Sequence, residues 1–162
     1  DPSASIRAIA AWGLGRIPDS RSVGPLCTLL NDTDPLVVQR SLESLYGLSD
    51  TTALPCLVAA LPHACDLWLE TRRWSMRAIL ALSGPHAVDA LLAGLPAATE
   101  DQRPVFYGIL HLLTGQTFTT PEAWAAWWAR QHDRRLPVPG YYYTNEDLDH
   151  ACTSIPGDDA RR

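Results

Sequence analysis

The chain has 162 residues, of which 46% are hydrophobic and 19% are charged, and it carries a net charge of −5. These values are typical of one globular domain with a sizeable core, rather than of a disordered chain or a membrane protein. The negative charge argues against a general phosphate-binding surface, which needs clustered positive charge. All thirteen basic residues are arginine, and we attribute this bias to codon usage rather than to recognition of carboxylate or phosphate groups.

Apolar stripes of helical length recur three times between residues 23 and 95, at steps of 31 and then 34 residues. A stripe that recurs at this interval indicates stacked helix pairs, because one pair is too small to bury its own apolar face. The sequence therefore predicts an all-α solenoid, a right-handed superhelix of about four helix pairs. The second helices of the first three pairs supply the columns Val23, Leu54 and Val88; Leu26, Leu57 and Leu91; and Leu30, Leu61 and Leu95.

The first helices carry a matching set of apolar columns, with members four residues apart on one helical face. We expect these positions, Trp74 included, to be buried. The columns are Ile6, Val38, Trp74 and Val105; Ala10, Leu42, Ala78 and Ile109; and Leu14, Tyr46, Leu82 and Leu113. The predicted helices span residues 3–16, 22–31, 35–48, 53–62, 68–83, 85–95, 101–114 and 120–133.

Local signals mark several helix ends. Asp34-Pro35, like Asp1-Pro2, is typical of a helix start, because the carboxylate accepts hydrogen bonds from orphan N–H groups and proline presets φ. Gly15 and Gly47 come just after an apolar stripe and predict left-handed helix stops.

The fourth pair ends in an aromatic-rich helix, with Thr119 or Thr120 as its cap. Trp124, Trp127 and Trp128 follow at spacing i, i+3, i+4 on one face. An aromatic closing helix covers the otherwise exposed face of a last repeat. We therefore expect these three tryptophans to lie in the core.

Residues 1–136 are predicted to form the repeat domain, with the helix at 120–133 as its cap. Beyond Leu136 the periodicity fails, so residues 137–162 are predicted to form an irregular, partly mobile tail. Within that tail, Thr144 and Asp147 are suited to cap one short turn of helix near 145–152. Because the first residue is Asp1 and the chain begins within a repeat, we expect a fragment or a processed product.

The four cysteines, Cys27, Cys56, Cys65 and Cys152, form no C-x-x-C pair, unlike most metal sites and disulfide frameworks. Cys27 and Cys56 lie on apolar helical stretches, where free cysteine behaves as a small hydrophobe. We expect them to be reduced and structural, in keeping with a cytoplasmic location. No metal or cofactor is predicted.

Several short sequence segments within about residues 1–133 resemble bacterial HEAT-like repeats, the short kind also found in phycobilisome-lyase-type proteins. The resemblance implies fold rather than function, because the matching residues are packing residues. They are Asp1-Pro2, Ile6-Arg7 and Gly13-Leu14-Gly15-Arg16-Ile17 in the first pair, and Gly84-Pro85-His86-Ala87-Val88-Asp89-Ala90-Leu91-Leu92 in the third. Thr114-Gly115-Gln116, Phe118, Ala123-Trp124 and Trp127-Trp128 resemble a closing segment of such proteins.

Two enzyme types with this architecture are disfavoured by the residues present. Deoxyhypusine hydroxylase holds two irons through repeated His-Glu pairs, whereas none of the five histidines here has an adjacent glutamate. Bilin lyases handle a tetrapyrrole, which needs an apolar groove with Arg or His contacts to its propionates, and the sequence marks no such groove. His86 and Asp89 are suited to a catalytic pair or a capping contact, and no nucleophile or metal partner accompanies them.

The sharpest polar cluster contains Trp68, Arg72, Arg73 and Arg77. It resembles the base-holding helices of DNA-alkylation-repeat glycosylases, since aromatic faces and cations suit base stacking and phosphate contact. We favour a solvated helix face, with Glu70 partly pairing the arginines. We keep these four residues as candidate partner-binding positions.

The tyrosine triplet is the second candidate, because three consecutive aromatic side chains cannot all be buried on one face. The triplet either packs back on the last repeat or presents a motif to a partner. Its members are Tyr141, Tyr142 and Tyr143.

The sequence thus predicts a non-enzymatic protein-interaction or scaffold module, the C-terminal portion of a larger HEAT-repeat protein. Its partner is expected to be another protein or the remainder of the same polypeptide, rather than nucleic acid or a membrane. The alternative is a solenoid that acts on nucleic acid or handles a tetrapyrrole. The usual binding side of such solenoids is the concave surface lined by second helices, where the polar positions are sparse and include Arg21, Thr28, His86 and Asp89.

Overall fold

The structure is a computed structural model that describes residues 3–131, 136 and 143–153, and the regular structure of these residues is helical, without a strand. The chain divides into two compact units, Asp1–Leu82 (unit 1) and Ser83–Arg162 (unit 2). The division lies between the two helices of the third predicted pair. The predicted fold class, an all-α solenoid, is confirmed.

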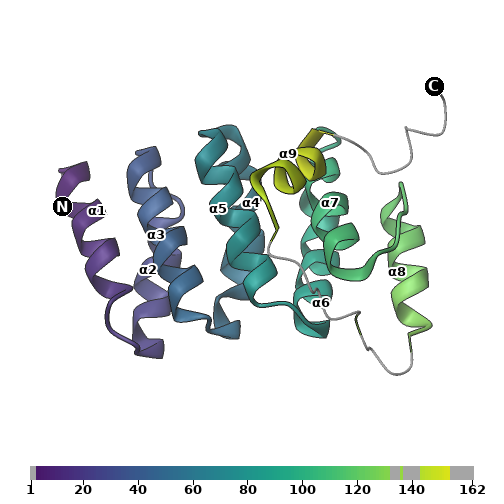
Figure 1. Cartoon of the computed structure of the whole chain (residues 1–162), viewed down its shortest axis with the longest axis horizontal. Helices are drawn as coiled ribbons and strands as arrows, with labels where there is room; N and C mark the ends of the chain where they lie inside the picture. The colour runs from purple at the N-terminus through teal and green to yellow at the C-terminus, as the bar shows by residue number, and fades with distance from the viewer. Residues whose placement is uncertain (1–2, 132–135, 137–142, 154–162) are drawn as a thin grey trace. The chain divides into compact units, whose positions relative to one another are not determined.

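Unit 1 contains two complete helix pairs and the first helix of a third. The first helices lie side by side in the order α1, α3, α5, and α2 and α4 pack behind them (Figure 1). Short 3-10 turns at Ser20–Ser22 and Thr51–Ala53 lead into the second helices. The bounds are α1 Ala4–Leu14, α2 Val23–Leu29, α3 Pro35–Leu48, α4 Leu54–Asp66 and α5 Leu69–Ala81.

Unit 2 contains α6 and α7, covered by two further helices. The closing helix α8 packs on α6, and α9 packs on α7. The bounds are α6 Pro85–Gly94, α7 Arg103–Thr114, α8 Pro121–Ala129 and α9 Asn145–Thr153.

The columns predicted for the second helices are confirmed at every position. All nine side chains, from Val23 to Leu95, are at most 5% exposed. Their burial within successive repeats accounts for most of the regularity in the sequence, because each helix pair relies on its neighbour to cover this face.

The columns predicted for the first helices are confirmed only in part. In α7 all three members are buried, but in α1 none is, and Ile6 is 53% exposed. Helix α1 buries Ala8 and Ala11 instead, because within unit 1 it has α2 and α3 on one side and no helix on the other. Trp74 is half-buried rather than buried.

The predicted helix start at Asp34 is confirmed, since its carboxylate accepts a hydrogen bond from Leu36 N at 2.9 Å, with Pro35 in the first turn. The predicted left-handed stops are wrong. Gly15 has a right-handed φ of −69°, and Gly47 lies inside α3, whose left-handed cap is Ser49 at φ 51°. Gly15 is needed for a different reason, because a Cβ there would lie 2.3 Å from Ser44 Oγ on the adjacent helix.

The closing helix behaves largely as the sequence predicted. Thr120 caps α8 by accepting a hydrogen bond from Ala123 N at 3.2 Å. Trp124 and Trp128 are buried, while Trp127 is half-buried against Phe118, with ring centroids 6.0 Å apart. The aromatic side chains of α8 therefore close the core of unit 2.

The short turn predicted near 145–152 is the nine-residue helix α9, capped by reciprocal hydrogen bonds between Thr144 and Asp147. Leu148 is fully buried. Helix α9 approaches α7 so closely that a Cβ at Gly108 would lie 2.2 Å from the carbonyl oxygen of Ala151. The rest of the predicted tail, 137–142 and 154–162, lies outside the described residues, and the boundary at 136 stays a prediction.

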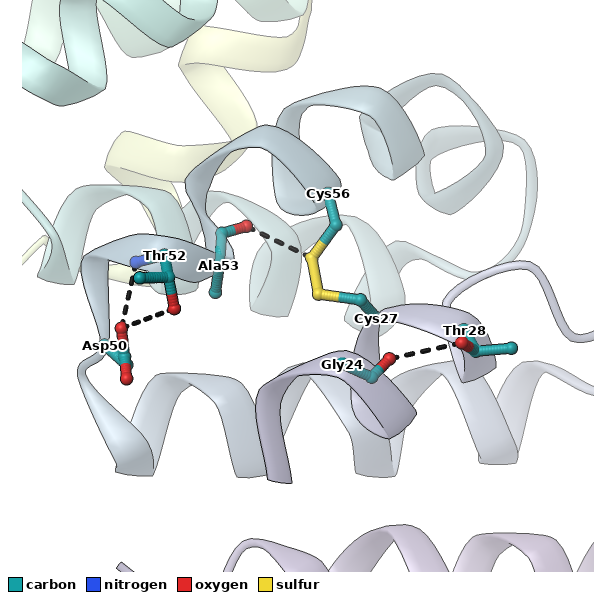
Figure 2. Close-up of a disulfide and its surroundings, with 7 residues drawn as sticks. All are labelled: Gly24, Cys27, Thr28, Asp50, Thr52, Ala53 and Cys56. Atoms are coloured by element: carbon teal, nitrogen blue, oxygen red, sulfur yellow. Dashed lines mark hydrogen bonds between the residues drawn. A yellow bond between two sulfur atoms is a disulfide. The ribbon is translucent and has the colours of Figure 1, made fainter. Parts of the chain in front are cut away.

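The expectation of reduced cysteines is wrong for one pair. Cys27 of α2 and Cys56 of α4 form a disulfide, with their Cα atoms 5.7 Å apart (Figure 2). Stacking places second helices of successive repeats side by side, so residues about one repeat apart become neighbours. Disulfides persist mainly in oxidising compartments, so the predicted cytoplasmic location loses this support.

Within the described residues, no helix combines the length and the apolar character needed to cross a bilayer.

Candidate functional site

Exposed large hydrophobic side chains are concentrated in unit 1. Every such side chain among the described residues lies between residues 6 and 69. Scattered surface hydrophobes are ordinary, but a contiguous group marks an interaction site. The eight side chains are Ile6, Ile9, Trp12, Ile17, Leu36, Tyr46, Trp68 and Leu69.

Three of these side chains form one face of α1, which we call the α1 face: Ile6, Ile9 and Trp12, with exposed fractions of 53%, 67% and 47%. Helix α1 contains no acidic residue, and its one charged residue, Arg7, is held by an ion pair to Asp32. Helix α1 therefore contributes only apolar side chains to the α1 face.

The equivalent positions of the next first helix are covered. Ile9 and Trp12 lie 32 residues before Ser41 and Ser44, which are 0% and 6% exposed in α3. Ser44 donates a hydrogen bond to the carbonyl oxygen of Ala11 in α1 at 2.9 Å. The α1 face thus occupies the repeat positions that, in α3, pack against the preceding first helix, α1.

Two hollows adjoin Trp12. One, of about 330 Å³, lies beside the α1 face and includes Leu36 and Arg40 of α3 in its lining. The other, which we call the tryptophan groove, has a volume of about 380 Å³ and is lined by residues of α1, α3 and α5 and of the turn after α1. The groove is lined by Trp12, Gly15, Arg16, Glu43, Ser44, Gly47 and Trp74.

An arginine guanidinium lies over the ring of each tryptophan in the groove. The guanidinium carbon of Arg16 lies 4.6 Å from the ring centroid of Trp12, and that of Arg77 lies 5.4 Å from the ring centroid of Trp74. Such cation–π contacts hold a guanidinium over the face of the ring. Tyr46 adds an edge contact to Trp74, with centroids 5.7 Å apart.

The single carboxylate of the groove is already engaged. Glu43 accepts a hydrogen bond from Gln39 Nε2 at 2.7 Å and one from Arg40 Nη1 at 2.6 Å. Its charge is thereby offset by Arg40. Since Arg16 also lines the groove, the local charge is positive although the whole chain is acidic.

A separate polar cluster around Asp32 is structural. Arg7 of α1 donates two hydrogen bonds to the Asp32 carboxylate, at 2.7 and 2.8 Å. Asp34 N donates to the same carboxylate, and His63 of α4 donates to the Asp32 carbonyl oxygen. The hydrogen bonds from Arg7 lower the pKa of Asp32. This cluster ties α1 and α4 to the loop before α3.

The structure places the predicted arginine cluster along α5. Trp68 precedes the helix and is exposed, Arg73 pairs with Glu70, and Arg77 stacks on Trp74. Arg72 lies on the same helix and is half-buried. Of the four predicted positions, Arg77 contacts a residue that lines the groove, Trp74; all four stay predictions as partner-binding residues.

The tyrosine triplet is described only at its last member. Tyr143 is half-buried in unit 2, and its hydroxyl donates a hydrogen bond to the carbonyl oxygen of Leu112 at 3.0 Å. Burial raises the pKa of Tyr143. Tyr141 and Tyr142 lie outside the described residues, so their assignment as partner-binding residues stays a prediction.

Of the predicted pair His86 and Asp89, Asp89 makes a contact that stabilises the fold. Asp89 accepts a hydrogen bond from the indole N–H of Trp128 at 2.7 Å, which fastens α8 to α6. No group of three or more His, Cys, Asp or Glu side chains in the described part of the chain is arranged to hold a metal ion.

Sequence reasoning missed Ile9, Trp12, Arg16 and Tyr46 as surface residues. The available signal was the composition of α1, where apolar residues occupy nearly every position from Ile6 to Leu14. A helix that is apolar on all sides needs cover on all sides.

The stacked pairs of unit 1 define a helical repeat protein, and the comparison with family models agrees. Residues 1–70 match the model for HEAT repeats. The match covers fewer than half of the 162 residues, and it shows that this part of the chain is similar to HEAT repeats. No curated protein and no solved structure matches the sequence.

Proposed function

We propose that the chain is a non-enzymatic protein-interaction module of a larger HEAT-repeat protein, and that the α1 face is where its partner docks. The partner is another protein or a further part of the same polypeptide. The observation that carries this proposal is the exposure of Ile6, Ile9 and Trp12 at repeat positions that α3 buries.

The free energy gained by burying apolar side chains favours a partner that covers the α1 face. Burial of a large apolar side chain stabilises a complex by roughly 1.5–3 kcal/mol, and three such side chains lie together here. Aromatic residues of this kind are over-represented among the residues that dominate binding energy. Terminal repeats of a free solenoid carry a polar outer face for solubility, and the α1 face lacks one.

The HEAT-repeat match supports the same reading, because such repeats commonly act as scaffolds for other proteins. The usual binding side of a solenoid is the surface lined by second helices. The exposed aromatic side chains Trp12 and Tyr46 belong instead to the first helices α1 and α3. We therefore place the partner on the first-helix layer of unit 1.

Site-specific photocrosslinking in the native host tests this proposal. A photoreactive amino acid at Ile9 is expected to yield one discrete crosslinked adduct, which peptide mapping assigns to another protein or to a further part of the same polypeptide. The same group at exposed Glu100 of unit 2 is the control. A Trp12→Arg change is expected to reduce the adduct at Ile9 at least tenfold. Absence of an adduct from Ile9, or equal adducts from both positions, would contradict the proposal.

A further inference from the structure

We propose that the tryptophan groove binds an extended acidic peptide segment of a protein partner. This inference rests on the proposed function, since it names the chemistry of the partner that a second part of unit 1 recognises. It concerns a different surface from the α1 face, with Trp12 belonging to both.

The lining of the groove fits an extended chain. Two large rings, Trp12 and Trp74, occur together with Gly47, whose Cβ position has no atom within 4 Å, so a ligand backbone can come close there. Grooves that combine aromatic rings in this way take up extended peptides, whose preformed backbone loses little entropy on binding. A volume of about 380 Å³ is at the low end of the roughly 300–1,000 Å³ of ligand sites, so it accepts a short stretch of chain.

The charges select an acidic ligand over a basic one. Arg16, which lines the groove, lies over the ring of Trp12, and a guanidinium has N–H groups along its edge that suit a carboxylate. Both oxygens of Glu43 already accept hydrogen bonds from Gln39 and Arg40. A carboxylate therefore meets an excess of positive charge, whereas a lysine or arginine would have to compete with Arg40 for Glu43.

A nucleic acid is the less suitable anion. Binding along a phosphate backbone relies on many cationic contacts, and the chain as a whole has a net charge of −5. The groove offers a local positive site flanked by rings, which matches a few carboxylates on a peptide. An oligonucleotide therefore serves as a comparison ligand in the test.

Fluorescence anisotropy with three labelled peptides tests the inference on the whole 162-residue chain. The peptides are proline-spaced and about ten residues long, with glutamate, glutamine or lysine at the alternate positions. We expect the glutamate peptide to bind at least tenfold more tightly than the other two, and its binding to weaken in high salt because the contact is partly screened. Equal binding of the glutamate and glutamine peptides, absence of binding, or tighter binding of a single-stranded oligonucleotide would overturn it.

A pair of glycine variants separates the groove from general effects on folding. Gly47 lines the groove and Gly13 does not; a Cβ at either meets no atom within 4 Å, and both lie inside helices. Gly47→Leu is expected to fill the groove and to weaken binding of the glutamate peptide at least tenfold. Gly13→Leu, the matched control, is expected to leave binding unchanged. If both variants fold, by circular dichroism, and bind equally, the groove is not the site.

Arg16→Gln distinguishes charge recognition from ring contact. It is expected to abolish the preference for the glutamate peptide over the glutamine peptide, and a retained preference would count against the inference. The proposed function fails separately, through the missing adduct at Ile9. An adduct at Ile9 without any peptide binding would support the proposed interaction module and contradict the proposal of an acidic peptide ligand.

Discussion

Units 1 and 2 use aromatic side chains in opposite ways. In unit 2, Trp124 and Trp128 are buried, and their indole N–H groups donate to Phe118 O and to Asp89. In unit 1, Trp12 and Trp68 are about half exposed. The number of aromatic residues in a repeat therefore does not indicate whether those residues are buried.

The cause is the presence or absence of a covering element within each unit. In unit 2 the helices α8 and α9 pack on α6 and α7. In unit 1 the outer side of α1 has no such cover, and its apolar residues form a surface. The predictions that follow test this contrast, beginning with the largest expected effect.

Trp124→Ala is expected to destabilise unit 2 by about 3–5 kcal/mol, because it empties a fully buried aromatic site and removes the hydrogen bond to Phe118 O. Trp12→Ala is expected to cost unit 1 less than about 1 kcal/mol, because its side chain is half exposed. Urea unfolding measures both, combined with hydrogen exchange of α6–α8 for unit 2 and of α1–α5 for unit 1. Similar losses from the two substitutions would contradict the contrast.

Loss of the Cys27–Cys56 disulfide is expected to destabilise unit 1 by about 3 kcal/mol, because the bond restricts the unfolded chain over a sequence separation of 29 residues. Reduction of the disulfide, or the double change Cys27→Ser and Cys56→Ser, is expected to raise amide exchange in α2 and α4. Exchange in α6 to α8 is expected to stay unchanged. A reductant has no further effect on the double variant if the disulfide alone is responsible.

Gly108→Ala is expected to weaken the docking of α9 on α7 by about 1–3 kcal/mol, because the new Cβ would collide with the carbonyl oxygen of Ala151. The readout is faster amide exchange in α9. Gly13→Ala in α1 is the control: its Cβ meets open space, and removal of a helical glycine is expected to stabilise by roughly 0.5–1 kcal/mol. Unaltered exchange in α9 of Gly108→Ala would contradict the close approach of the two helices.

Asp32→Asn is expected to give the smallest effect, with a distinct pH dependence. Because the hydrogen bonds from Arg7 lower the pKa of Asp32, the carboxylate stabilises the fold above its ordinary pKa of about 3.9. That contribution is lost as the pH falls through the lowered pKa. The difference in urea midpoint between wild type and variant is therefore expected to be full at neutral pH and to shrink in acid. A difference that stays constant with pH would show that the charge of Asp32 does not matter.

Much of the fold was predictable from short-range patterns. The columns of the second helices, the Asp34 and Thr120 caps and the short helix begun by Thr144 all follow from spacing or from local hydrogen bonding. These features were predictable because they depend on residues a few positions apart, or on a repeat that returns at a regular step.

The errors have a common physical origin in contacts between successive helices. The disulfide was missed because Cys27 and Cys56 are far apart along the chain but adjacent in neighbouring second helices. Ile6 was expected to be buried because an apolar column gives no indication of whether a covering helix is present. Gly15 was read as a helix stop, although it serves the close contact with Ser44.

The periodicity of apolar residues along the chain is enough to specify a stack of helix pairs and the stripe of each second helix that faces the core. Which apolar side chains stay exposed to solvent, and which charges lie near them, depends instead on how the helices pack in three dimensions. Burial depends on the neighbour that a helix receives. The α1 face and the tryptophan groove therefore became visible only when α1, α3 and α5 were placed side by side.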